Sequence, residues 1–160
     1  MILESAVSAP LAPPLQISRW FNTPAPLDLM QLRGKVVVVH AFQMLCPGCV
    51  QHGLPQTQRL WQLFRRDDLM VIGLHSVFEH HAVMGPPALQ TFIQEYRWDF
   101  PIGIDQPAAH NPVPLTMQAY GLQGTPSLVL LDRRGRIRLQ HLGRIDDIML
   151  GLAVGQLLAE

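Results

Sequence analysis

The chain of 160 residues has only two cysteines, no run of charge of one sign and no long hydrophobic run. Its 12 Lys and Arg residues balance its 12 Asp and Glu residues, so nothing favours binding to nucleic acid or to an anionic membrane surface. No segment approaches the roughly 18 apolar residues that span a bilayer. The first residues also lack the positive start and apolar stretch of a signal peptide. We therefore expect a cytoplasmic protein without nucleic-acid or membrane partners.

Sequence motifs of several enzyme classes are missing as well. The chain has no glycine-rich phosphate loop, no Gly-x-Ser-x-Gly and no paired carboxylates at useful spacing, which leaves nucleotide-binding and hydrolase functions without support. A lone cysteine pair in a reducing cytosol is more often catalytic or metal-binding than a structural staple. The two cysteines are therefore the main candidates for chemistry.

The two cysteines form the motif Cys46-Pro47-Gly48-Cys49, after the apolar run Val36–Phe42 and before an amphipathic stretch. A strand, a Cys-x-x-Cys and a helix in this order are typical of a thiol–disulfide site. Unpaired N–H groups and the dipole at a helix start favour the thiolate, which is the nucleophile. Pro47 suits the first helical position, where a missing N–H costs nothing. We predict that Cys46 attacks and that Cys49, one turn further in, resolves the mixed disulfide.

The pattern of apolar segments predicts one α/β domain over residues 15–160, with helices on both faces of a central mixed sheet. The early strands should be parallel through right-handed crossovers, and the last two should form an antiparallel hairpin. The expected strands are 16–22, 36–42, 69–77, 100–104, 127–131 and 136–142. The Ala-, Pro- and Ser-rich residues 1–14 are expected to form a flexible N-terminal arm, ordered only if it docks.

Four helical segments are expected: one from residue 47, and others around 89–96, around 117–120 and after Asp146 or Asp147. Gly53 and Pro55 should kink the first helix early, because proline removes a helical hydrogen bond and clashes with the preceding turn. The residues of the last helix expected to face inward are Ile148, Leu152 and Leu158.

Three segments of the chain carry a family resemblance: residues 32–39, the Cys-x-x-Cys at 46–49, and 121–127 with the strand and turn that follow. Together they resemble a thioredoxin-like fold. They are most similar to the TlpA-type disulfide reductases, on the border with the alkyl-hydroperoxide-reductase-like redoxins. The resemblance covers about residues 15–158. It implies a redox-active disulfide without a further cofactor, a disulfide-containing protein or small molecule as substrate, and a thiol electron donor that it does not identify.

The resemblance also implies roles for Pro126 and Thr125. In the family, the corresponding proline is cis and lies against the active-site sulfurs. The backbone of the residue before it pairs with an extended substrate, strand to strand. Pro126 and Thr125 are expected to take these two roles. The alternative is a plain trans turn before a strand.

Three residues near the cysteines depart from the family pattern. Leu45 replaces the usual aromatic residue before the first cysteine. His40 stands six residues before that cysteine, where an acid or Asn is common, and His52 stands three residues after the second, where Glu is common. Histidine can move protons nearer its ordinary pKa of about 6.5, so we hypothesise that His40 or His52 accepts the proton of Cys49. The alternatives are a core histidine at 40 and an exposed helix residue at 52.

The loop after residue 75 contains residue types that bind zinc or copper, namely Glu79, His80 and His81, with His75 upstream. Adjacent histidines point to opposite sides of an extended chain, however, and no partner motif is visible. We interpret this segment as a polar loop at the rim of the active site and predict no metal site.

Three functions are compatible with these patterns. The first is a thiol–disulfide oxidoreductase that works in the reducing direction. The second is a redoxin-type peroxidase. It ranks lower because its motif, Pro-x-x-x-Thr-x-x-Cys, has Val39 and Gln43 at the Pro and Thr positions here. The third is a redox-inert module that holds an extended partner near Pro126, which the intact cysteine pair disfavours.

Overall fold

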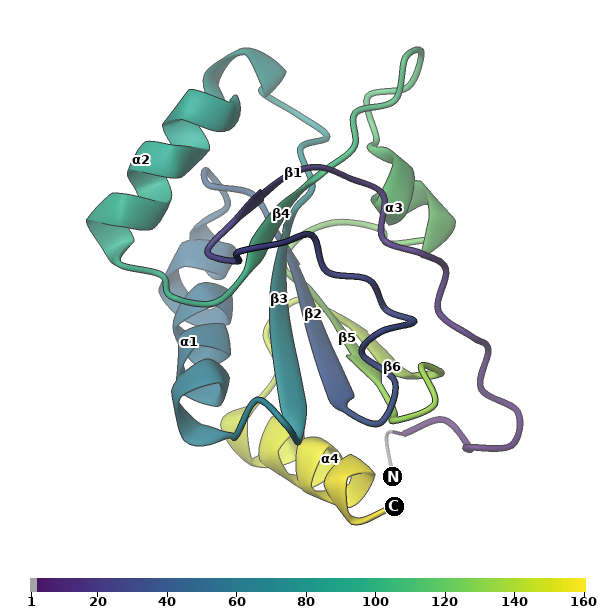
Figure 1. The fold of residues 1–160 in the computed structure, drawn as a ribbon. Helices are drawn as coiled ribbons and strands as arrows, with labels where there is room; N and C mark the ends of the chain where they lie inside the picture. The colour runs from purple at the N-terminus through teal and green to yellow at the C-terminus, as the bar shows by residue number, and fades with distance from the viewer. Residues whose placement is uncertain (1–2) are drawn as a thin grey trace.

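The computed structural model describes residues 3–160, which surround a six-stranded sheet in the order β1-β4-β3-β2-β5-β6. The strands are β1 (Ile17–Phe21), β2 (Val36–Phe42), β3 (Leu69–His75), β4 (Ile102–Asp105), β5 (Ser127–Leu131) and β6 (Ile137–Leu142). The three strands β2, β3 and β4 are mutually parallel, whereas β1, β5 and β6 run antiparallel to their neighbours (Figure 1). The mixed sheet with a terminal hairpin is therefore as predicted.

The helices also follow the predicted order. They are α1 (Leu54–Leu63), α2 (Pro86–Tyr96), α3 (Leu115–Ala119) and α4 (Asp147–Ala159), with a π-helical turn η1 (Cys49–Gly53) before α1 and a 3-10 turn η2 (His81–Val83) before α2. Asp146 caps α4, because its Oδ1 accepts a hydrogen bond of 2.9 Å from the Ile148 N–H. Within residues 3–160, none of the helices combines the length and the apolar content needed to cross a membrane.

Strand β2 joins the two halves of the core, and all of its residues are buried. Its even-numbered side chains, such as Val38 and Phe42, pack in one apolar cluster with α1, α2 and α4. Its odd-numbered side chains face a second cluster, which the loop 22–35 and Tyr120 close on the side of α3 (Figure 1). Because strand side chains alternate, His40 shares the face of Val38 and Phe42. The polar ring of His40 therefore lies among apolar side chains on this face of the sheet.

The predicted early kink of the first helix takes the form of the π-helical turn η1. Pro55 has no N–H to donate to the carbonyl four residues earlier, and the wider turn just before it accommodates this gap. Gly53 allows this turn to approach β2 closely, since a Cβ at residue 53 would overlap the ring of His40. The helix that carries Cys49 therefore packs directly on the His40 ring.

The predicted inward face of α4 is wrong in part. Ile148 and Leu152 are 80% and 56% exposed, and Leu158 is half-buried. The residues of α4 that face the core are Leu150, Ala153, Val154 and Leu157. No charged residue occurs from 148 to 159, so no polar stripe in the sequence marks the outer face of this helix.

The N-terminal segment lies along the outer edge of β6. The N–H of Ile137 donates to the Pro10 carbonyl at 2.8 Å, the N–H of Ala12 donates to the Gly135 carbonyl at 2.9 Å, and Leu11 pairs with Arg136. Docking was the condition under which the arm was expected to be ordered. Its flexibility stays a prediction, and residues 1–2 of the predicted arm lie outside the described residues.

A buried ion cluster joins the two ends of the described chain. Arg138 is 2% exposed, and its guanidinium contacts Asp132 at 3.3 Å and Glu160 at 2.6 Å. Its Nε also donates to the Glu4 carbonyl at 2.6 Å. Asp132 follows β5 at the end of the sheet where β2 begins, so this cluster lies at the opposite end of β2 from the cysteines (Figure 1).

Candidate active site

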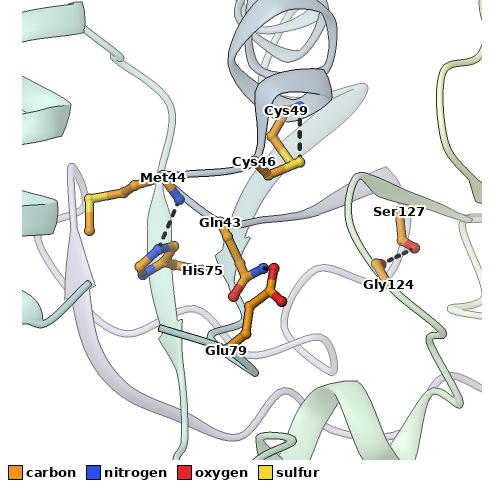
Figure 2. Close-up of a disulfide and its surroundings, with 8 residues drawn as sticks. All are labelled: Gln43, Met44, Cys46, Cys49, His75, Glu79, Gly124 and Ser127. Atoms are coloured by element: carbon orange, nitrogen blue, oxygen red, sulfur yellow. Dashed lines mark hydrogen bonds between the residues drawn. A yellow bond between two sulfur atoms is a disulfide. The ribbon is translucent and has the colours of Figure 1, made fainter. Parts of the chain in front are cut away.

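Cys46 and Cys49 form a disulfide just beyond the end of β2, with a Cα–Cα distance of 5.2 Å (Figure 2). Helical conformation begins at Pro47, as predicted. Cys49 is fully buried, whereas Cys46 is half-buried. An incoming sulfur can therefore reach Cys46 more easily than Cys49. This exposure agrees with Cys46 as the attacking residue, although the division of roles stays a prediction.

One backbone N–H contacts the sulfur of Cys46, and a second bonds its carbonyl. The N–H of Cys49 donates to the Cys46 Sγ at 3.2 Å, and the N–H of Val50 donates to the Cys46 carbonyl at 3.1 Å. The first turn of η1 has no acidic residue that would repel a thiolate. Hydrogen bonds to the charged form and the positive end of a helix both favour ionisation. After reduction of the disulfide, the Cys49 N–H would face the freed Cys46 sulfur, an arrangement that favours the predicted attacking role of Cys46.

Pro126 lies against the cysteine motif from the neighbouring strand. Its peptide bond with Thr125 is cis, as the resemblance implied. A Cβ at Gly48 would lie 3.4 Å from the Pro126 Cδ, so the proline ring and the backbone of Gly48 are in contact. The N–H of Gly143 donates to the Pro126 carbonyl at 2.8 Å and holds this loop. Pairing of Thr125 with a substrate stays a prediction.

The two predicted proton acceptors have different environments. His40 is completely buried, its Nε2 has no hydrogen-bond partner within the described residues, and burial lowers its pKa to about 4. The ring is therefore neutral at pH 7, as a proton acceptor must be, but it is a weak base. Contact with Gly53 places it against the same turn as Cys49. His52 is exposed on η1. A proton transfer to either ring stays a hypothesis.

Two residues that hold the loop before Cys46 were missed as site residues. The Met44 N–H donates to the Nε2 of His75 at 3.4 Å, and burial lowers the pKa of His75 to about 4, which keeps this nitrogen an acceptor (Figure 2). Gln43 is 2% exposed, and its Oε1 accepts from the Phe78 N–H at 3.1 Å. Its Nε2 faces the Glu79 carboxylate at 3.5 Å. These contacts tie residues 43 and 44 to the segment after β3.

The histidines of the predicted rim loop do not gather into a metal site. Within residues 3–160, no group of three His, Cys, Asp or Glu side chains is close enough to hold an ion. His75 is buried against Met44 instead, and the Nε2 of His81 lies 3.0 Å from the Pro112 carbonyl.

The fold is shared with known thioredoxin-like proteins. A crystal structure of a thioredoxin-like superfamily protein matches with a TM-score of 0.93 and 50% identity, over 95% of this chain and 98% of that one. A thiol-disulfide isomerase from Corynebacterium glutamicum matches with a TM-score of 0.92 and 51% identity, over 96% of this chain and 99% of that one. Together with the Cys-x-x-Cys disulfide, these matches confirm the predicted class, a thioredoxin-like thiol–disulfide oxidoreductase.

Sequence comparison identifies the family within that class. The Redoxin family model matches residues 9–148, and the chain belongs to this family. Protein DipZ of Mycobacterium tuberculosis is 31% identical over an alignment of 150 residues that covers 92% of this chain and 20% of DipZ. Thiol-disulfide oxidoreductase ResA of Halalkalibacterium halodurans is 24% identical over 77% of this chain and 62% of that protein. The chain thus spans only about a fifth of DipZ and less than two thirds of ResA.

Proposed function

We propose that the protein reduces disulfides of proteins or small molecules. The Cys46 thiolate attacks one sulfur of the substrate disulfide and forms a mixed disulfide, while the other substrate sulfur leaves as a thiolate. Cys49, deprotonated, then attacks Cys46, which forms the Cys46–Cys49 disulfide and releases the second substrate sulfur. The observation that carries this proposal is the half-exposed Cys46 sulfur beside a helix-start N–H, with Cys49 buried behind it.

The reducing direction rests on the cytoplasmic location expected from the sequence, because cytosolic glutathione and thioredoxin keep thiols reduced. Location and direction are both part of the proposal. The disulfide itself is the redox group, and we propose no further cofactor. A thiol donor must return the oxidised pair to the dithiol after each cycle.

The surroundings of Gln43 support a disulfide substrate over a peroxide. The peroxidase motif has threonine at this position. The Gln43 amide is buried instead, and its two ends face Phe78 and Glu79. The threonine of the peroxidase motif is therefore replaced by a buried amide whose two ends are both engaged.

The test is a stopped-flow comparison of reduced protein mixed with insulin or with hydrogen peroxide. We expect fast oxidation of the cysteine pair by the insulin disulfides and only free-thiol speed with peroxide. The Cys49→Ser variant should stop at the mixed disulfide with insulin, and Cys46→Ser should not react. Fast peroxide reaction with slow insulin reaction would identify a peroxidase. If a Cys46→Ser, Cys49→Ser double variant kept the protein's full function, that function would need no redox chemistry, and the protein would be a redox-inert binding module.

A further inference from the structure

A polar cavity of about 220 Å³ adjoins the cysteine motif; we call it the His40 cavity. Its walls come from η1 and the start of α1, from Pro126, from residues 143–145 between β6 and α4, and from Asp147 at the start of α4. Pro126 belongs both to this cavity and to the contact with Gly48. A molecule that extends from the cavity past Pro126 would therefore approach the cysteine motif at Gly48.

A buried polar atom belongs to the wall of this cavity. His40 lines the cavity, is completely buried, and its Nε2 has no hydrogen-bond partner within residues 3–160. Nε2 itself has less than 1 Å² of exposed surface, so His40 contributes a polar wall to the cavity and not an open hydrogen-bonding position. The two adjoining side chains of η1, Gln51 and His52, are exposed at the mouth and also polar.

The rim of the cavity has more positive than negative charge. Arg59 and Arg144 face a single carboxylate, that of Asp147. The Nη2 of Arg59 contacts the two Asp147 oxygens at 2.9 and 3.0 Å. The pKa of Asp147 is lowered first by a hydrogen bond from Gln56 and further by the charges of Arg59 and Arg144, which places Arg144 near this carboxylate. Arg144 forms no ion pair of its own within residues 3–160.

We propose that the His40 cavity binds the carboxylate-bearing part of a low-molecular-weight thiol, and that this thiol is the electron donor for the Cys46–Cys49 disulfide. The inference rests on the proposed function, since it names the donor class for that reaction. The unpaired Arg144 charge complements a carboxylate, and the polar wall formed by His40, Gln51 and His52 suits the rest of a peptide-like acid. A cavity of about 220 Å³ can hold only part of a small peptide-like acid, and a folded protein donor could not enter it.

The reaction balances with two donor thiols for each protein disulfide. The first donor thiolate attacks the Cys46 sulfur, a donor–Cys46 bond forms, and Cys49 leaves as a thiolate that takes up a proton. A second donor thiolate attacks the donor sulfur of that mixed disulfide and releases Cys46. The donor is oxidised to its disulfide and the protein is reduced to the dithiol.

The experiment compares reduced glutathione with its diethyl ester as reductants of the oxidised protein. The two probes have the same thiol, but both carboxylates of the ester are masked. Each rate is divided by the rate of the same probe with hydroxyethyl disulfide, which corrects for thiol reactivity. We expect glutathione to saturate and to be about fivefold faster than the ester, as a partly exposed charge contact of ~1 kcal/mol implies.

Two arginine variants separate a specific site from a general charge effect. Arg144→Gln should bring the glutathione-to-ester ratio close to one. Arg134→Gln, in the exposed turn at the other end of the sheet, should leave the ratio unchanged. Equal rates for the two probes with the unmodified protein, or an unchanged ratio in Arg144→Gln, would overturn the inference.

A separate assay keeps this result distinct from the proposed function. Insulin reduction driven by dithiothreitol, which has no carboxylate, measures the oxidoreductase reaction without the cavity. If the protein reduces insulin but glutathione and its diethyl ester react at equal corrected rates, only the donor site is rejected. Absence of insulin reduction would reject the proposed function itself.

Discussion

At the residue scale, the His40 ring packs against Gly53 in the turn that begins at Cys49. The His40 ring occupies the space that any side chain at residue 53 would need. Burial of an imidazole without a hydrogen-bond partner for Nε2 lowers stability, and such costs are often retained where a residue has a function. The place of the ring against the turn that carries Cys49 gives the proton-acceptor hypothesis a structural basis.

Replacement of His40 should therefore slow the resolving step more than replacement of His52. We expect His40→Asn to reduce the rate of mixed-disulfide resolution by about a hundredfold, the lower end of the range for a general base, because the ring lies against the turn that carries Cys49. His52→Ala should change the rate less, since its ring is exposed. The measurement is the rate–pH profile of insulin reduction, with His110→Ala as an exposed control. Unchanged profiles in both active-site variants would reject the hypothesis.

Gln43 should act on Cys46 through the loop that it holds. In Gln43→Glu, the new carboxylate keeps the Phe78 contact but faces Glu79 without a hydrogen to donate. The added negative charge should disfavour the Cys46 thiolate and slow its alkylation by iodoacetamide by roughly two- to fivefold near neutral pH. Adding Glu79→Gln restores the original net charge of the pair, and the amide at residue 79 can then donate a hydrogen bond to the carboxylate at residue 43. The alkylation rate of the double variant should therefore return to that of the unmodified protein. If the double variant is as slow as the single one, Gln43 acts by packing alone.

At the element scale, α4 shows how a helix can be predicted without its orientation. Its start is marked by the Asp146 cap, and its length by an uninterrupted apolar segment. Its face is not marked, because small and large apolar residues alternate with no charge among them. Only the shape of the sheet decides that Leu157 is inside and Leu152 outside.

Two matched substitutions in α4 test this orientation. Leu157→Ala should lower the free energy of unfolding by about 2–5 kcal/mol, as expected for a fully buried leucine. Leu152→Ala changes helix propensity equally but removes a mainly exposed side chain, so it should cost less than about 1 kcal/mol. Urea unfolding of the disulfide form measures both values. Similar losses in the two variants would show that the orientation is wrong.

At the scale of the whole molecule, the sequence predicted what depends on neighbouring residues. Strand β2 was predicted with its observed bounds because a near-continuous run of β-branched residues is typical of a buried strand. The turn at 132–135 was predicted from its residue types. The cis bond at Pro126 came from the family resemblance. The contacts of His75 with Met44 and of Gln43 with Phe78 join residues 31 and 35 positions apart, so no local pattern could reveal them. The docked arm was unpredictable for the same reason.

The stability of the whole protein should fall in mild acid because of two buried histidines. His40 and His75 have a pKa of about 4 in the folded protein, against the ordinary 6.5 when unfolded. The unfolded chain therefore binds more protons between these values, so stability is full above about pH 6.5 and is lost as the pH falls towards 4. The loss should be on the order of 3 kcal/mol per histidine.

Guanidinium unfolding at pH 7, 5.5 and 4.5 measures this loss. His75→Gln should remove about half of the pH dependence in this window, because His40 still contributes, whereas His110→Gln, at an exposed position, should keep all of it. Equal unfolding free energies at pH 7 and pH 4.5 in the unmodified protein would contradict the buried, neutral state of both rings.

The ion cluster of Arg138 determines how the molecule can be attached to a surface. Glu4 and Glu160 meet at this one arginine, at the end of β2 remote from Cys46 (Figure 1). An anchor, a fusion partner or an electrode linker at either end of the chain would therefore leave from the same pole. Immobilised in this way, every copy would present its disulfide outward, and the choice of end would not change the orientation.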